Sequence, residues 1–277
     1  MSLTALAMLA FASNSLLCRA ALKHTAIDPA TFTTLRIVAG AGVLCWLTGR
    51  RAQRPAGSWR SALALFIYAA AFSFAYVELE AGTGALLLFG AVQLTMIGHG
   101  CWRGERLGLA QWSGLVLALG GLAALLLPSA SAPPGHSTLL MLVAGMAWGI
   151  YSLRGSAQSS ALAATAGNFL RAVPFALALS LVGWPAPWPG LTGVALAAAS
   201  GALASGVGYA TWCAALRGLR SSQAAAVQLT VPVVATVGGT ALLGESITLH
   251  QALASAAVPG GVGLVLFVRN IKAAATF

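Results

Sequence analysis

The sequence predicts an all-α integral membrane protein: ten transmembrane helices as two inverted five-helix repeats, with both termini cytoplasmic. Three observations predict this fold. Charged residues make up 7% of the 277 residues and hydrophobic residues 58%, whereas soluble domains carry roughly 25% charged residues. Apolar runs long enough to cross a bilayer follow one another along the chain. A segment beginning with Gly-Glu occurs twice, 140 residues apart.

Breaker clusters determine the number of spans, because a spanning helix needs about 20 mostly apolar residues. Residues 128–135 and 183–190 are rich in Pro and Gly, and each interrupts a long run without Asp, Glu, Lys or Arg. The predicted spans are 3–22, 29–48, 60–79, 83–102, 107–127, 138–155, 161–182, 191–213, 221–243 and 248–268.

The charged residues predict the orientation of these helices. Eleven of the fifteen Lys and Arg residues fall after even-numbered spans: Arg50, Arg51, Arg54, Arg60, Arg103, Arg106, Arg154, Arg217, Arg220, Arg269 and Lys272. The opposite connections hold Asp28, Glu78, Glu80 and Glu245. Basic loops remain in the cytoplasm, so we expect a multi-pass protein of the bacterial inner (plasma) membrane. Because the basic residues form no single patch, the net charge of +10 does not indicate a nucleic-acid partner.

The repeat divides the chain into a first half, 1–135, and a second half, 136–277. Residues 104–127 and 244–267 share seven of 24 positions, including a Gly-Glu pair, a Gln and a Gly-Gly pair. Weaker matches relate Thr34-Leu35-Arg36 to Phe169-Leu170-Arg171. Five helices are an odd number, so the second half enters the bilayer from the opposite side. Inverted repeats are typical of secondary transporters.

These motifs resemble the EamA group of the drug/metabolite transporter superfamily. The resemblance rests on the two Gly-Glu pairs, the Gly-Gly pairs, the Arg in helices 2 and 7, and the run Trp148-Gly149-Ile150-Tyr151. Within that group the chain looks most like the YddG-type exporters of aromatic amino acids. The family usually has a proline midway along helix 4, and residues 90–95 here contain none.

The resemblance implies a ten-helix bundle that exports amino acids or related metabolites from the cytoplasm. The first four helices of each half would enclose a central cavity, and helices 5 and 10 would support them from behind. It implies no cofactor. The residues themselves offer no catalytic constellation, no nucleotide-binding loop and no metal-ligand spacing among the four cysteines, so we expect a non-enzyme with no catalytic residues and no metal.

Aromatic and polar residues at membrane depth are the candidates for the substrate cavity, although each also has an ordinary packing interpretation. The predicted cavity residues are Asn14, Tyr68, Phe72, Phe89, Trp148, Tyr151, Tyr209, Gln228 and Pro232. Arg36 and Arg171 are costly in a bilayer. Each is either a counter-charge for a substrate carboxylate or part of a structural ion pair or carbonyl cap.

The favoured function is therefore secondary transport: export of amino acids, aromatic ones first, by alternating access through a central cavity. The alternatives are a broader metabolite or drug exporter and, ranked lower, a non-transporting membrane enzyme or scaffold. The expected partners are a small-molecule substrate and the lipid bilayer. Two repeats in one chain make a monomer sufficient.

Overall fold

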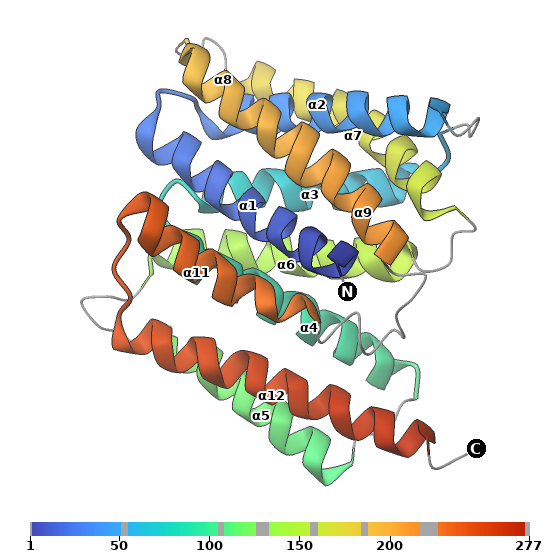
Figure 1. Ribbon diagram of the computed structural model, residues 1–277, viewed down its shortest axis with the longest axis vertical. Coiled ribbons are helices and arrows are strands. Elements are labelled where there is room, and N and C mark those ends of the chain that lie inside the picture. Colours follow the sequence, from blue (N-terminus) through green and yellow to red (C-terminus); the bar gives the residue numbers. More distant parts are fainter. Residues whose placement is uncertain are drawn as a thin grey trace.

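The computed structural model describes residues 2–50, 55–104, 108–125, 133–155, 160–183, 188–215 and 227–274. Within these ranges all regular secondary structure is helical (Figure 1). The elements are α1 (Ser2–His24), α2 (Pro29–Arg50), α3 (Trp59–Ala75), α4 (Ala81–Trp102), α5 (Leu109–Leu125), α6 (Gly135–Gly155), α7 (Ala161–Val182), α8 (Gly190–Ala199), η1 (Ser200–Val207), α9 (Gly208–Ala215), α11 (Thr230–Leu243) and α12 (Leu249–Ala274). The prediction of an all-helical chain is confirmed.

Six helical segments within the described ranges are long and apolar enough to cross a membrane. They are Leu3–His24, Pro29–Arg50, Ala81–Trp102, Gly135–Gly155, Ala161–Val182 and Gly190–Ala215, the last made of α8, η1 and α9 in succession. Trp59–Ala75 and Thr230–Leu243 are shorter apolar helices. The start of the predicted span 221–243 lies partly outside the described residues, since 216–226 are not described.

The helices lie side by side with their axes running the same way across the view (Figure 1). Helices α2, α7 and α8 occupy one edge of the bundle, and α5 and α12 occupy the other. Between them lie α1, α3, α6, α4 and α11. The start of α1 and the end of α12 lie toward the same side of the view, so both termini are near one end of the bundle.

Helix α3 is shorter than the predicted span 60–79, because it ends at Ala75 and the chain turns at Tyr76. The Arg19 guanidinium explains this difference. Its Nη1 donates to the carbonyl oxygens of Tyr76 at 3.1 Å and Val77 at 2.8 Å. Those carbonyls would accept from the next helical turn if α3 continued, and here they bind a side chain of α1 instead.

The repeated segment near 104 and 244 has the same local structure in both copies. Gln111 Oε1 accepts from the backbone N–H of Gly108 at 2.9 Å. Gln251 Oε1 accepts from the N–H of Thr248, also at 2.9 Å. Each glutamine thus satisfies a free N–H at the start of its helix, α5 or α12, which explains why it recurs at the 140-residue offset.

Helices α5 and α12 pack against each other through the repeated glycine pairs. A Cβ on Gly121 would lie 2.7 Å from the Cβ of Ala257, and a Cβ on Gly261 would lie 2.4 Å from the Gly114 carbonyl oxygen and 2.6 Å from the Ala118 nitrogen. The second glycine of each pair therefore permits the close approach of the two helices. This pair lies at one side of the bundle (Figure 1), as the family resemblance implied for helices 5 and 10.

Candidate functional site

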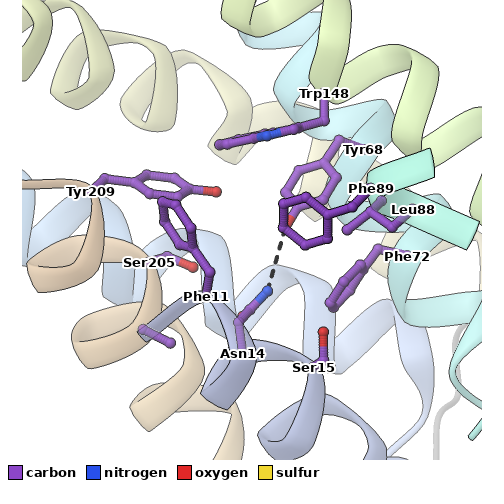
Figure 2. Close-up of a pocket in the computed structure, with 11 residues that line it drawn as sticks. Phe11, Asn14, Ser15, Tyr68, Phe72, Leu88, Phe89, Trp148, Ser205 and Tyr209 are labelled. Atoms are coloured by element: carbon purple, nitrogen blue, oxygen red, sulfur yellow. Dashed lines mark hydrogen bonds between the residues drawn. The ribbon is translucent and has the colours of Figure 1, made fainter. Parts of the chain in front are cut away.

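A cavity lies in the interior of the bundle, between α1, α3, α4, α6, η1 and α9 (Figure 2). Its lining residues are Phe11, Asn14, Ser15, Tyr68, Phe72, Leu88, Phe89, Trp148, Ala204, Ser205 and Tyr209. The centre of a water molecule can occupy about 20 Å³ of it, which is the space of about one water. The cavity is therefore nearly closed, and its aromatic side chains fill most of the room between the helices.

The Trp148 ring packs against three tyrosine rings in and beside this cavity. Its ring lies 4.8 Å from the Tyr68 ring, 5.3 Å from the Tyr151 ring and 5.2 Å from the Tyr209 ring, centroid to centroid. The last two pairs are stacked, with interplanar angles of 28° and 30°. Phe11 packs edge-on against Tyr209 at 5.7 Å. Such contacts can be exchanged for contacts with a planar apolar ligand, because aromatic rings stack or pack edge to face at these distances.

A chain of hydrogen bonds through Ser200, Asn14 and Tyr68 runs along one side of the cavity. The Ser200 hydroxyl donates to Asn14 Oδ1 at 2.7 Å, which orients the amide so that Nδ2 donates to the Tyr68 hydroxyl at 3.3 Å (Figure 2). Arg36 Nη2 also donates to the Tyr68 hydroxyl, at 2.9 Å. The polar groups come from α1, α2, α3 and η1, so several helices are held in register at this depth.

Arg36 lies directly behind the cavity wall and is 1% exposed. Its guanidinium packs over the rings of Tyr68 and Phe72, at 5.1 and 4.9 Å from their centroids. Nε donates to Ser205 Oγ at 3.4 Å, and Nη1 is buried without a hydrogen-bond partner among the described residues. The two ion pairs found in the described ranges do not involve Arg36.

Element η1 is a π-helix in the middle of the rod 190–215, and it forms one wall of the cavity. It contributes Ala204 and Ser205 to the lining, and Ser200 to the hydrogen-bond chain. Small residues let it lie against α2: a Cβ on Gly201 would be 2.2 Å from the carbonyl oxygen of Arg36. π-Helical turns within α-helices are frequent at functional sites.

The structure brings six of the nine predicted cavity residues into the lining: Asn14, Tyr68, Phe72, Phe89, Trp148 and Tyr209. Tyr151 stacks behind Trp148, and its hydroxyl lies 3.4 Å from that of Thr165. Gln228 is half-buried ahead of α11, and Pro232 is buried in the first turn of α11. Neither lines the cavity.

Arg171 is placed away from the cavity, unlike Arg36. Its Nη1 donates to the carbonyl oxygens of Ala56 at 2.7 Å and Gly167 at 2.9 Å. Between the two interpretations of the sequence, this placement favours the carbonyl cap. Arg36 and Arg171 occupy matching positions in the repeat, but their side chains therefore lie in different surroundings.

Sequence reasoning missed the lining residues Phe11, Ser15, Leu88, Ala204 and Ser205. Phe11 and Ser15 lie beside Asn14 on α1, at i−3 and i+1, and helical spacing from Asn14 was the available signal for Phe11. The small and aliphatic residues carry no such signal, because the same residue types recur all along these helices.

A buried ion pair that the sequence did not reveal involves Arg19, one helical turn along α1 from the cavity residue Ser15. Arg19 Nε on α1 lies 3.1 Å from Glu245 Oε1 in the α11–α12 connection, with the side chains 10% and 6% exposed. Glu245 Oε2 accepts from the backbone N–H of Ala81 at 2.8 Å. Because Arg19 also binds the α3–α4 turn, three parts of the bundle meet at this point. We call it the Arg19–Glu245 closure.

Comparisons with known proteins agree with this architecture. The EamA-like transporter family model matches residues 1–127 and again residues 137–267. An uncharacterized protein of Pseudomonas aeruginosa is 56% identical over 275 residues, covering 98% of this chain and 96% of that protein. A protein of known crystal structure is 19% identical and has a TM-score of 0.69, with 97% of this chain and 99% of that chain covered; this likeness shows the fold alone.

The described residues hold no group of three or more His, Cys, Asp or Glu side chains able to bind a metal ion. What the cavity offers is aromatic stacking surface and a few hydrogen-bonding groups. Two family matches together cover most of the chain. The chain belongs to the EamA-like transporter family and is a multi-pass membrane transporter of small molecules.

Proposed function

We propose that this transporter exports amino acids, with aromatic ones preferred, through the cavity of Figure 2. The single observation that carries the proposal is the aromatic cluster around Trp148. The ring centroids of Tyr68 and Tyr209 lie 4.8 and 5.2 Å from the centroid of the Trp148 ring. A cavity of mostly apolar and aromatic side chains with a few convergent polar groups is typical of a small-molecule site. Asn14, Ser15 and Ser205 supply such groups here.

The proposed mechanism is alternating access between two inverted halves, 1–135 and 136–277. The lining comes from both halves: α1, α3 and α4 contribute from the first, and α6, η1 and α9 from the second. Because the cavity has room for only about one water, its aromatic side chains must move apart when a substrate enters. The Arg19–Glu245 closure would then open on the side of release, driven by the substrate gradient or by a coupled ion.

The proposed topology has ten spanning helices, both termini in the cytoplasm and the chain in the bacterial inner membrane. Support comes from the positions of the basic residues in the sequence and from the two termini lying near the same end of the bundle (Figure 1). In this orientation Arg19 and Glu245 lie near the periplasmic surface, so the closure is the exit gate for export.

Counterflow in proteoliposomes tests the function. Vesicles loaded with unlabelled phenylalanine, tryptophan, threonine or alanine are diluted into trace labelled compound at equal pH on both sides. Strong exchange of phenylalanine and tryptophan is expected. Exchange confined to threonine and alanine would refute the aromatic preference, and no exchange of any amino acid would refute amino acid transport.

Trp148→Ala supplies the matching test of the site. The variant removes a side chain in contact with three rings, so exchange should fall below detection while the protein still inserts and purifies. Trp112→Ala is the control, since Trp112 is 53% exposed on α5, far from the cavity lining. Equal exchange by the two variants would contradict the proposed role of Trp148.

A second apolar hollow favours the alternative of a broader metabolite or drug exporter. It lies between α1 and the η1–α9 rod, with about 460 Å³ open to the centre of a water-sized molecule, and Leu6, Leu9, Leu203 and Leu242 are among its lining. Ala204 borders both this hollow and the aromatic cavity. An apolar solute could therefore reach the cavity from the lipid side. Competition of phenylalanine exchange by structurally unrelated apolar solutes would identify this broader function.

A further inference from the structure

We propose that Arg36 and Tyr68 form an anion subsite at the wall of the cavity, and that the transported solute is recognised by its carboxylate and not by its ammonium group. The inference rests on the proposed function and deepens it. It predicts that the substrate class is the aromatic or large apolar monocarboxylate, with or without an amino group.

The charge of Arg36 is uncompensated among the described residues. The four described acidic side chains are engaged elsewhere: Glu245 with Arg19, Glu78 with His136, Glu80 with Gln251, and Asp28 with the first N–H groups of α2. A buried cation without a counter-ion is unfavourable, and its Nη1 has no acceptor among the described residues. An anionic ligand at this depth would supply both the missing charge and the missing acceptor.

The direction of the hydrogen bonds leads to the same ligand. The Tyr68 hydroxyl oxygen accepts from Arg36 Nη2 at 2.9 Å and from Asn14 Nδ2 at 3.3 Å, and a hydroxyl oxygen has two lone pairs. The Tyr68 hydrogen must therefore point onward. Tyr68 lines the cavity, so this hydrogen is free to bind an acceptor there.

The chain from Ser200 through Asn14 to Tyr68 therefore ends on an O–H donor. In the amide orientation that the structure has, Asn14 Oδ1 accepts from the Ser200 hydroxyl at 2.7 Å, and Nδ2 faces Tyr68. The network thus presents hydrogen-bond donors next to a fixed positive charge. Charge-assisted bonds from such donors to a carboxylate are stronger than bonds between neutral groups, and an acceptor anion is the ligand that completes the network.

No comparable provision exists for an ammonium group. The residues that line the cavity include no Asp or Glu, and Arg36 behind them would repel a second cation. The aromatic faces of Trp148 and Tyr209 can accept a cation, but they are equally suited to an aromatic ring. A substrate therefore gains from its carboxylate and gains little from its amino group.

Three ligands of similar shape test the subsite with the wild-type protein. Phenylalanine has both charged groups, 3-phenylpropionate lacks the ammonium, and phenethylamine lacks the carboxylate. We expect 3-phenylpropionate to compete with labelled phenylalanine in counterflow within about threefold of phenylalanine itself, and phenethylamine to be at least about tenfold weaker, given the strength of hydrogen bonds to charged groups. Equal or stronger competition by phenethylamine overturns the proposal.

Variants assign the preference to the guanidinium. Arg36→Gln should reduce phenylalanine exchange about tenfold or more and should remove the advantage of 3-phenylpropionate over phenethylamine. Arg36→Lys should keep part of that advantage, because lysine keeps the positive charge but has a different donor geometry. Arg171→Gln is the matched control and should keep the wild-type ratio, since Arg171 binds backbone carbonyls away from the cavity. An unchanged ratio in Arg36→Gln overturns the proposal.

A binding measurement separates this inference from the proposed function. Thermal stabilisation of the purified protein by 3-phenylpropionate, with none by phenethylamine, supports the subsite even if no compound is exchanged; absence of exchange then refutes only transport of these solutes. Stabilisation by phenethylamine alone, or by neither compound, overturns the subsite whatever the flux.

Discussion

Replacing Glu245 with glutamine should open the end of the bundle that the Arg19–Glu245 closure holds shut. Glutamine has the size of glutamate and its amide oxygen can still accept from the Ala81 N–H. Its amide nitrogen then faces Arg19, whose charge is left without a counter-ion. Arg19 would keep the carbonyls of Tyr76 and Val77, so the α1–α3 contact persists and the α11–α12 connection is released.

The magnitude follows from burial. Both side chains of the pair are about nine-tenths buried, and removing one partner of a buried pair costs about 3–5 kcal/mol. Opening the closure hydrates Arg19 and relieves that cost. The equilibrium between closed and open forms should therefore shift toward the open form by about 10²- to 4 × 10³-fold, at about 1.4 kcal/mol for each factor of ten.

A native cysteine reports this opening. Cys18 precedes Arg19 on α1 and is 0% exposed. In a background where Cys45, Cys101 and Cys213 are alanine, the rate of maleimide labelling of Cys18 in detergent measures the open fraction. We expect Glu245→Gln to raise that rate by up to the factor given above, with a lower melting temperature.

Glu78→Gln is the matched control at the same end of the bundle. Its pair with His136 is exposed, with side chains 38% and 70% accessible, and exposed pairs contribute about 0–1 kcal/mol. Labelling of Cys18 should therefore change by no more than about fivefold. If Glu245→Gln labels no faster than Glu78→Gln and melts at the wild-type temperature, the closure does not hold this end shut.

Two further predictions concern stability. Gly201→Ala places a Cβ 2.2 Å from the Arg36 carbonyl oxygen; such overpacking costs about 1–3 kcal/mol and should lower the melting temperature, whereas Gly42→Ala, with no atom within 4 Å of its Cβ, should not. Arg171→Ala removes the bonds to the Ala56 and Gly167 carbonyls and should cost about 1–3 kcal/mol with phenylalanine affinity in counterflow unchanged; a matching loss of affinity would contradict its placement outside the site.

The aromatic part of the cavity was predictable because of its residue types. Tyr68 and Phe72 share a helical face at i, i+4, and Trp148 lies mid-helix, where an indole is unusual outside the interfacial belt. Both inferences use only local spacing along one helix. Gln228 and Pro232 were assigned by polarity and by helix-breaking character, which indicate a special position but not which helix face points inward.

The polar part of the site required contacts between distant helices. Arg36 meets Tyr68 from 32 residues away and Ser205 from 169 residues away. Arg19 and Glu245 are separated by 226 residues. These pairs depend on the rotation of each helix about its axis and on its shift along neighbouring helices. Helices that are apolar on all sides have no polar face to specify that rotation.

By itself the sequence determined the helical class, the positions of the helices, the repeat at 140 residues and the membership of a transporter family. These properties depend on local hydrogen bonding and on hydropathy, because a segment in lipid must satisfy its backbone groups within itself. Only the tertiary structure decided that Arg36 lies behind Tyr68 without a counter-ion among the described residues, while Arg171 caps backbone carbonyls. The two arginines occupy matching positions in sequence, and their surroundings differ because side-chain packing between helices, unlike helix formation, is not local.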